Sequence, residues 1–317
     1  MKVRTVALLL VFFTGAVWAQ YPSRPIRLIV PIPPGGAPDI AARVIGEKLS
    51  GQMGQPVVVE NKAGSNGNIA SEAIARAAPD GYTIGLIADS QVVVNPHLYK
   101  NMPFDTLKDL FPISTIAAHE FVLTINPDLP AKTFPEFIEY ARTANPPLNY
   151  ASGGNGSQHH LMMEMLKQRA GIKLVHVPYR GGSPATAATV AGETAVMWAG
   201  SSNAAQIKAG RLRAIAVSSA KRSTEHPDLP AIAEFYPGYD NSIWLGVFGP
   251  AGLPEPVLDR LRAEIRKALD SQEVKQRLAR AGGLEPYLTT VDEFDALIRR
   301  EYDKYGKVVK ELGLKID

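Results

Sequence analysis

The segment Leu28-Ile-Val-Pro-Ile-Pro-Pro-Gly-Gly-Ala-Pro-Asp-Ile-Ala-Ala-Arg43 contains an apolar run, a glycine turn and the start of a helix. The run through Ile32 is typical of a buried strand, and residues 33–36 end it. Pro38 and Asp39 are favourable in a first helical turn. Because the first N–H groups of a helix lack intrahelical partners and its dipole attracts negative charge, this turn predicts an anion site. An ordinary βα turn would give the same pattern.

The alternation of strands and helices continues beyond this segment. Strands are expected at residues 26–32, 56–60 and 82–88, with helices at 41–53 and 69–77. This order predicts a parallel sheet, whose ligands bind beyond the carboxyl ends of the strands. The Gly35-Gly36 turn, the turn near Gly64 and Ser90 all lie at that edge, whereas residues 104–112 are expected to be mostly loop.

A second strand, glycine turn and helix start at Leu148, with Ser157 as the expected N-cap or first-turn hydroxyl donor. Further strands are expected at 121–125, 175–179, 194–199, 212–217 and 242–249. The predicted fold class is therefore α/β with two domains, each a mostly parallel sheet flanked by helices. The predicted domains are residues 20–123 plus 244–317, to which three C-terminal helices return, and residues 124–243.

Two domains that each carry such a turn predict a clamp for a small carboxylate. Closure brings two helix N-termini onto the ligand, and because backbone N–H groups supply the attraction, the site requires no Lys or Arg.

The first 19 residues read as a secretory signal rather than as part of the fold. Lys2 and Arg4 precede an apolar run that ends in Val17-Trp-Ala19, a small-x-small cleavage pattern. An uncleaved anchor is the alternative. Cleavage after Ala19 leaves 32 basic against 31 acidic side chains, so the basic character of the precursor is no argument for nucleic-acid binding. The chain has no cysteine, which excludes disulfides, thiol catalysis and Cys-ligated zinc. Export predicts a periplasmic location.

Other chemistries are weakly indicated. Ser157 with His159 or His160 would be the catalytic pair of a serine hydrolase, but such close spacing at one helix start rarely gives that geometry. His160 and Glu164 have i,i+4 metal-ligand spacing without a second liganding cluster, so no metal is expected. Neither dinucleotide-binding nor P-loop motifs occur, so no cofactor is expected. Asp39 has three readings: helix-start electrostatics, a general base, or orientation of the ligand through water.

Many segments together resemble the periplasmic solute-binding proteins of tripartite tricarboxylate transporters, of the Bordetella uptake gene (Bug) type. The segments that carry the resemblance are Tyr21-Pro-Ser-Arg-Pro-Ile-Arg-Leu-Ile-Val-Pro31, Pro33-Pro-Gly-Gly36 with Asp39, Gln55-Pro-Val-Val-Val-Glu-Asn61, Ala77-Ala-Pro-Asp-Gly-Tyr82, Ala151 to Gly156 with Ser157 and His160, His176-Val-Pro-Tyr179, Leu212-Arg-Ala-Ile-Ala-Val217 and Gly249-Pro-Ala-Gly252.

The resemblance implies a two-domain Venus-flytrap fold that binds an organic carboxylate (a di- or tricarboxylate or an aromatic acid) and delivers it to membrane permease subunits, as a monomer without enzymatic activity. A ligand-presenting sensor protein, a periplasmic hydrolase and a structural envelope protein are the alternatives. The ligand-binding residues that it implies are Ile32, Pro34, Gly35, Gly36, Asp39, Ser90, Gly156, Ser157, Gln158, Tyr179, Ala199, Gly200 and Ser201.

One departure from the family pattern concerns Met197-Trp-Ala-Gly200. Many relatives carry Phe and Asp where this chain has Trp198 and Ala199. If that acid pairs with the ammonium of amino-acid ligands, this protein should prefer ligands without one. Trp198 and Trp244 both have two readings, as pocket walls or as core residues, and a pocket Trp198 would suit an aromatic or longer apolar ligand.

Overall fold

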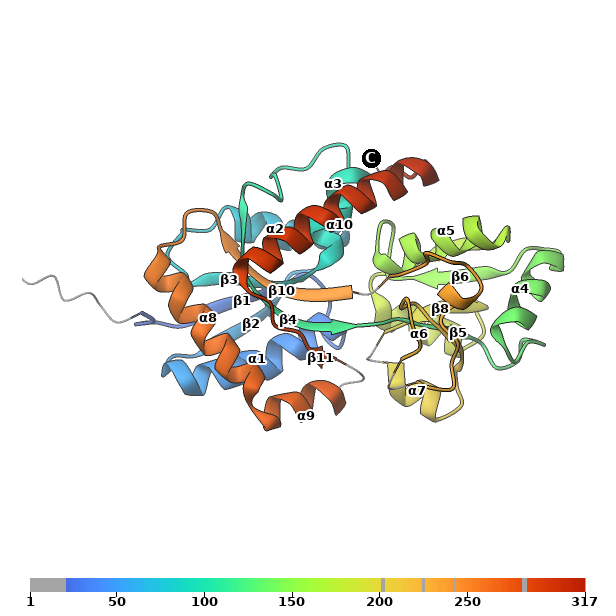
Figure 1. The fold of residues 1–317 in the computed structure, drawn as a ribbon, viewed down its shortest axis with the longest axis horizontal. Coiled ribbons are helices and arrows are strands. Elements are labelled where there is room, and N and C mark those ends of the chain that lie inside the picture. The colour runs from blue at the N-terminus through green and yellow to red at the C-terminus, as the bar shows by residue number, and fades with distance from the viewer. Residues whose placement is uncertain (1–20, 201–202, 224–225, 242, 281–283, 317) are drawn as a thin grey trace, which may run out of the picture.

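The computed structural model describes residues 21–316, apart from 201–202, 224–225, 242 and 281–283. It has two lobes at opposite ends of the long axis of the molecule, each built on one sheet (Figure 1). The predicted signal segment lies outside the described residues. No helix within the described part of the chain is both long and apolar enough to span a membrane.

The first lobe is built on a six-stranded sheet with the strand order β11-β4-β10-β3-β1-β2. Its strands are β1 (Ile26–Val30), β2 (Val57–Asn61), β3 (Thr83–Ala88), β4 (Leu110–His119), β10 (Ile243–Pro250) and β11 (Glu285–Pro286). Its helical elements are α1 (Ala37–Met53), η1 (Ser65–Gly67), α2 (Asn68–Ala75), η2 (Ser90–Val94), α3 (Asn95–Leu98), α8 (Glu255–Asp270), α9 (Gln272–Arg280) and α10 (Val291–Leu312).

The second lobe is built on a five-stranded sheet with the order β7-β6-β8-β5-β9. Its strands are β5 (Val122–Ile125), β6 (Asn149–Ser152), β7 (Val175–Pro178), β8 (Val196–Ala199) and β9 (Arg213–Val217). Its helical elements are α4 (Phe134–Thr143), α5 (Gln158–Ala170), α6 (Gly182–Val190), α7 (Ala204–Lys208) and η4 (Ile232–Glu234).

The α/β class with two sheets is confirmed, and most strands of each sheet run in the same direction, as predicted. In the first sheet β1 pairs in parallel with β2 and β3, whereas β10 is antiparallel to β3 and β4. In the second, β6 is parallel to β7 and β8, whereas β5 is antiparallel to β8 and β9. Strand β5 follows the crossing from β4, strand β10 follows the crossing from β9, and the short β11 is also antiparallel to β4. Strand β5 begins at Val122 and β10 at Ile243, so the predicted limits after residues 123 and 243 fall inside these two strands. The division into these domains stays a prediction.

Strand β4 lies largely in a stretch to which the sequence assigned no strand. Pro112 argues against a strand because proline cannot donate a ladder hydrogen bond. In the structure, β11 pairs with β4 only at Ala117 and Ala118, so the side of β4 near Pro112 that faces β11 has no strand partner. A register shift in the β10 ladder also falls next to Pro112. Both features accommodate the proline.

Each lobe has its own apolar core. Helices α1 and α8 cover one face of the first sheet around Ile45 and Leu261, and α10 covers the other face through Phe294. The second core surrounds Phe137 and contains Trp198, which is fully buried and stacks on Tyr239 with ring centroids 6.4 Å apart. Helix α10 also contacts α5 of the second lobe. The lobes therefore touch through packed side chains in addition to the two chain crossings.

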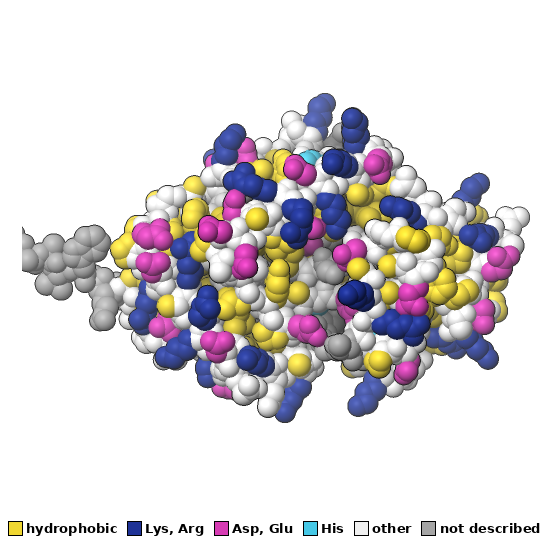
Figure 2. Space-filling model, viewed as in Figure 1, with side chains coloured by type: hydrophobic (Ala, Val, Ile, Leu, Met, Phe, Trp, Pro, Cys, Tyr) yellow, Lys and Arg dark blue, Asp and Glu magenta, His cyan; other side chains and the backbone are white. Residues whose placement is uncertain are grey.

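Charged side chains of both signs are interspersed over the visible face of both lobes (Figure 2). Several ion pairs join exposed partners on neighbouring helical turns, such as Arg299 with Asp295 and Arg76 with Glu72. Such pairs contribute little to stability, so the two apolar cores must supply most of it.

Candidate functional site

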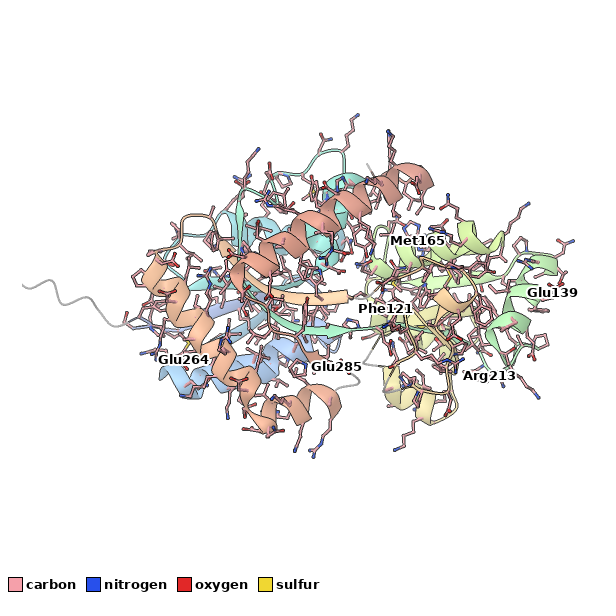
Figure 3. The ribbon with its side chains drawn as sticks, in the orientation of Figure 1. Phe121, Glu139, Met165, Arg213, Glu264 and Glu285 are labelled. Carbon is pink, nitrogen blue, oxygen red and sulfur yellow. The ribbon has the colours of Figure 1, made fainter. Side chains whose placement is uncertain are left out.

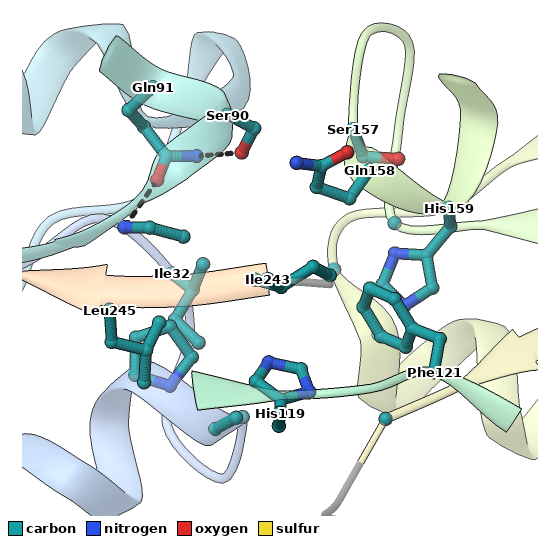
Figure 4. Close-up of a pocket in the computed structure, with 18 of the residues that line it drawn as sticks. Ile32, Ser90, Gln91, His119, Phe121, Ser157, Gln158, His159, Ile243 and Leu245 are labelled. Atoms are coloured by element: carbon teal, nitrogen blue, oxygen red, sulfur yellow. Dashed lines mark hydrogen bonds between the residues drawn. The ribbon is translucent and has the colours of Figure 1, made fainter. Parts of the chain in front are cut away.

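A pocket lies between the two lobes, at the edge where the parallel strands of both sheets end (Figure 4). Strands β1, β2 and β3 lead into its first-lobe wall, and β6, β7 and β8 lead into its second-lobe wall. The lining residues are Ile32, Gly36, Ala37, Pro38, Asn66, Ala88, Ser90, Gln91, His119, Phe121, Gly153, Ser157, Gln158, His159, Gly181, Gly182, Gly200, Asn203, Ile243 and Leu245. Among the described residues, therefore, no Lys, Arg, Asp or Glu lines this pocket.

Three helices present their N-terminal ends to the pocket. Helix α1 begins after its N-cap Gly36 with Pro38 in the first turn, as the sequence predicted. Helix α5 begins after Ser157, whose hydroxyl accepts the N–H of His160, and the predicted N-cap is confirmed. Helix α6 begins after Gly181, and the sequence analysis did not identify this third N-terminus. Three partially positive helix ends make the uncharged lining attractive to an anion.

The carboxylate of Asp39 holds the turn that precedes α1 through hydrogen bonds. It accepts hydrogen bonds from the N–H of Gly35 at 2.9 Å, from Arg43 at 2.8 Å and from Asn61 at 2.8 Å. Burial opposes ionisation, but these hydrogen bonds lower the pKa of Asp39 below its ordinary value. Asp39 does not line the pocket, so the geometry favours its reading as a residue that orders the helix start.

The first-lobe wall is held by a network of amides. Gln91 accepts the N–H of Ala88 at 2.9 Å and donates to the Asn66 carbonyl and to the Ser90 hydroxyl, each at 3.1 Å. The Asn66 side chain donates across the cleft to the carbonyl oxygen of Gly156 at 2.9 Å. Asn66 has a φ of 48°, a left-handed conformation that Asn tolerates better than most residues. The network therefore sets both the shape of this wall and its distance from the second lobe.

A second hydrogen bond across the cleft joins Gln158 to the buried carboxylate of Asp89. Gln158 donates to one carboxylate oxygen at 2.7 Å, and the N–H of Ser90 donates to the other at 2.7 Å. Asp89 is fully buried at the end of β3, and burial raises the pKa of its carboxyl to about 7 even though both hydrogen bonds oppose the shift. This carboxyl therefore links the end of β3 in the first lobe to Gln158 of the second lobe.

Replacement of Asp89 by asparagine should change how stability depends on pH. Because the folded state binds this proton more tightly than the unfolded chain, the stabilising contribution of Asp89 is complete below about pH 4 and is lost as the pH rises to about 7. Asparagine has no such loss. Between pH 4 and 8, the free energy of unfolding of the wild type should fall by roughly 4 kcal/mol relative to that of Asp89→Asn, as measured by urea titrations. Parallel pH profiles for the two proteins would contradict the prediction.

The sequence-predicted site residues fall into three groups. Those that line the pocket are Ile32, Gly36, Ser90, Ser157, Gln158 and Gly200. Those that do not line it are Pro34, Gly35, Asp39, Gly156, Tyr179 and Ala199. Ser201 lies outside the described residues.

The residues outside the lining have identifiable structural contacts. The Gly156 carbonyl accepts from Asn66, and a Cβ at Gly156 would approach side chains of Leu98 and Ile316. Tyr179 packs against the small core beside β6 and β8, and Ala199 is buried in the β8 ladder opposite Val122.

The two tryptophans belong to the apolar cores. Trp198 is 0% exposed and Trp244 is 4% exposed, and neither lines the pocket. The prediction that Trp198 forms a pocket wall is therefore wrong, and no argument for an aromatic ligand rests on this side chain. When a strand is buried on both faces, the side chains of either face lie in apolar surroundings. The alternation along the strand therefore does not distinguish a pocket residue from a core residue.

Ser157 and His160 do not form a hydrolase pair. The Ser157 hydroxyl donates to the Gly154 carbonyl at 2.7 Å, and Nδ1 of His160 accepts the N–H of Gly156 at 3.1 Å. The His160 ring stacks on His176 with centroids 4.0 Å apart.

Glu164 pairs with Lys167 and accepts a hydrogen bond from Tyr150. Within the described residues, no group of three or more His, Asp or Glu side chains is arranged to hold a metal ion.

Three ring side chains line the pocket although the sequence did not predict them as ligand-binding residues: His119, Phe121 and His159. His119 ends β4 and Phe121 lies on the crossing between lobes, where Figure 3 also places it. No motif marks such a crossing, because the contact depends on how the two sheets are placed. His159 was weighed only as a catalytic partner of Ser157, although its place in the first turn of α5 was a usable signal.

Comparisons with known proteins agree with this geometry. The tripartite tricarboxylate transporter family receptor (TctC) profile matches residues 41–314. Protein BugT of Bordetella pertussis is 36% identical over 299 residues, which cover 93% of this chain and 91% of BugT. The structure of the periplasmic binding protein BugD matches with a TM-score of 0.86 and 30% identity, over 93% of this chain and 99% of that one. MatC from Rhodopseudomonas palustris, solved with bound malate, matches with a TM-score of 0.85 and 28% identity, over 91% and 100%.

The family match covers most of the chain, and the fold, the interlobe pocket and the anion-attracting helix ends are those expected of a binding protein. The predicted resemblance to the Bug type is confirmed, and the hydrolase alternative has no support in the family or in the geometry of Ser157. The chain belongs to the tripartite tricarboxylate transporter receptor family and is a periplasmic solute-binding protein.

Proposed function

We propose that this protein captures a small organic carboxylate between its lobes and delivers it to the membrane permease of a tripartite tricarboxylate-type transporter. The observation that carries the proposal is the convergence of three helix N-termini on a pocket without Lys, Arg, Asp or Glu among its described lining residues. Such a site favours an anion through unpaired N–H groups and helix dipoles alone. The malate bound to MatC supports the same ligand chemistry.

The proposal assigns ligand contacts to Gly36, Ser90, Ser157, Gln158 and Gly200, with Ile32 on the apolar side. Ser90 accepts from Gln91, so its own hydroxyl hydrogen is free to donate to a ligand. Binding should close the lobe formed by residues 20–123 and 244–317 onto the lobe formed by residues 124–243. Export through cleavage of residues 1–19, action as a monomer and a role without catalysis belong to the same proposal.

The test is binding of the mature chain, stripped of co-purified ligand, to mono-, di- and tricarboxylates, aromatic acids and amino acids, measured by thermal shift. A ligand at 100 times its Kd stabilises the folded state by about 2.7 kcal/mol, which corresponds to an increase in Tm of roughly 5–10 °C. We expect such an increase with one class of carboxylate. The uncharged methyl ester of each acid is the matched control. If no acid raises the Tm, or if ester and acid raise it equally, the carboxylate proposal is wrong.

A further inference from the structure

We propose that the ligand is an aromatic carboxylate, whose ring lies against Phe121 between His119 and His159. This inference rests on the proposed function, because it takes the carboxylate to be held at the helix ends. The remaining part of the pocket then decides which acid fits.

Three ring side chains form one side of the pocket. The Phe121 centroid lies 5.1 Å from that of His119 and 4.7 Å from that of His159, with interplanar angles of 79° and 50°. Figure 4 shows these three rings along one side of the pocket and Ile32 and Leu245 on the opposite side. Ile243 lies between the two sides. Aromatic rings attract one another in edge-to-face and tilted arrangements at these distances. A planar ligand ring would extend the cluster, and its other face would meet aliphatic side chains.

The imidazole of His119 makes this side unfavourable for a second carboxylate. Nδ1 of His119 lies 3.2 Å from the carbonyl oxygen of Glu120, and a carbonyl only accepts, so Nδ1 carries the hydrogen. In the neutral ring Nε2 is then an acceptor, which repels a carboxylate oxygen. Burial lowers the pKa of His119 and of His159 to about 4, so both rings are neutral at pH 7. No cation among the described lining residues compensates.

Gly200 gives Phe121 the room to occupy this position. A Cβ at Gly200 would lie 3.0 Å from Cε1 and 3.6 Å from Cδ1 of the Phe121 ring. Phe121 is itself 6% exposed and packs into the core of the second lobe, which fixes its ring. The ring is therefore a fixed surface before any ligand binds, which reduces the entropy lost on binding.

The experiment compares benzoate with cyclohexanecarboxylate, which has the same number of carbons and the same charge but no planar ring. Adipate and malate serve as dicarboxylates and methyl benzoate as the uncharged control, and calorimetry at pH 7.5 gives each Kd. Benzoate should bind about tenfold more tightly than cyclohexanecarboxylate, which corresponds to two ring contacts, and more tightly than either dicarboxylate. Phe121→Leu removes one of these ring contacts and should reduce the benzoate-to-cyclohexanecarboxylate ratio to about three.

Phe137→Leu is the matched control variant, because Phe137 is a fully buried ring of the same core that does not line the pocket. It should lower the Tm while the ratio stays at about ten. Equal or tighter binding of cyclohexanecarboxylate or of a dicarboxylate by the wild type would overturn the aromatic assignment and leave the proposed function standing. If no acid binds more tightly than methyl benzoate, the proposed function fails as well.

Discussion

Replacement of Asn66 by aspartate is expected to weaken carboxylate binding by about 100-fold or more. The two side chains have nearly the same shape, but aspartate lacks the N–H group that Asn66 donates to the Gly156 carbonyl at 2.9 Å and to Asn95 at 2.7 Å. The variant loses a hydrogen bond across the cleft and places a negative charge on the pocket wall. Two like charges about 6 Å apart at an effective dielectric of about 20 repel by roughly 3 kcal/mol, which is about 100-fold in Kd.

Asn149→Asp is the matched control for this charge change. Asn149 donates to the Glu193 carbonyl at 2.8 Å on the second lobe and does not line the pocket. It loses the same kind of donor and gains the same charge, so it should lower the Tm without changing ligand affinity. The measurement is calorimetric titration of both variants with the acid that binds the wild type most tightly. An Asn66→Asp affinity within about threefold of the wild type would show that this wall does not face the bound anion.

Trp198→Ala is expected to lower the free energy of unfolding by about 3–5 kcal/mol. The side chain is fully buried, and truncation leaves a cavity in addition to the lost transfer free energy. Its ring also stacks on Tyr239, whose hydroxyl donates to the Met162 carbonyl at 2.9 Å, so one substitution disturbs β8, α5 and the segment before β10. Urea unfolding measures the loss.

Trp198→Phe separates a core role from a pocket role. A ring remains in the core, so the loss of stability should be much smaller than for alanine, and the affinity for the ligand should not change. The indole N–H of Trp198 has no hydrogen-bond partner, so phenylalanine leaves no acceptor without its donor. A large change in affinity with little change in stability would indicate that Trp198 contacts the ligand.

The sequence predicted structural features correctly where they depend on residues that are close together in the chain. The helix that starts after Gly36 and the Ser157 cap both depend on residues within four positions of one another. Strand β4 was missed because Pro112 is a local argument against a strand. The partners of β4, among them β10 from far along the chain, outweigh that argument.

The sequence by itself determined the α/β class, the family and the two glycine turns that begin α1 and α5. Each of these follows from short sequence segments whose backbone preferences do not depend on distant partners. Only the tertiary structure decided which side chains line the pocket between the lobes. It directed Asp39 to Arg43 and Asn61, buried Trp198 in the core, and brought His119, Phe121, His159 and the N-terminus of α6 to one pocket. The physical reason is that the pocket contacts join residues from two sheets, and the distances between these residues follow from how the two lobes pack together.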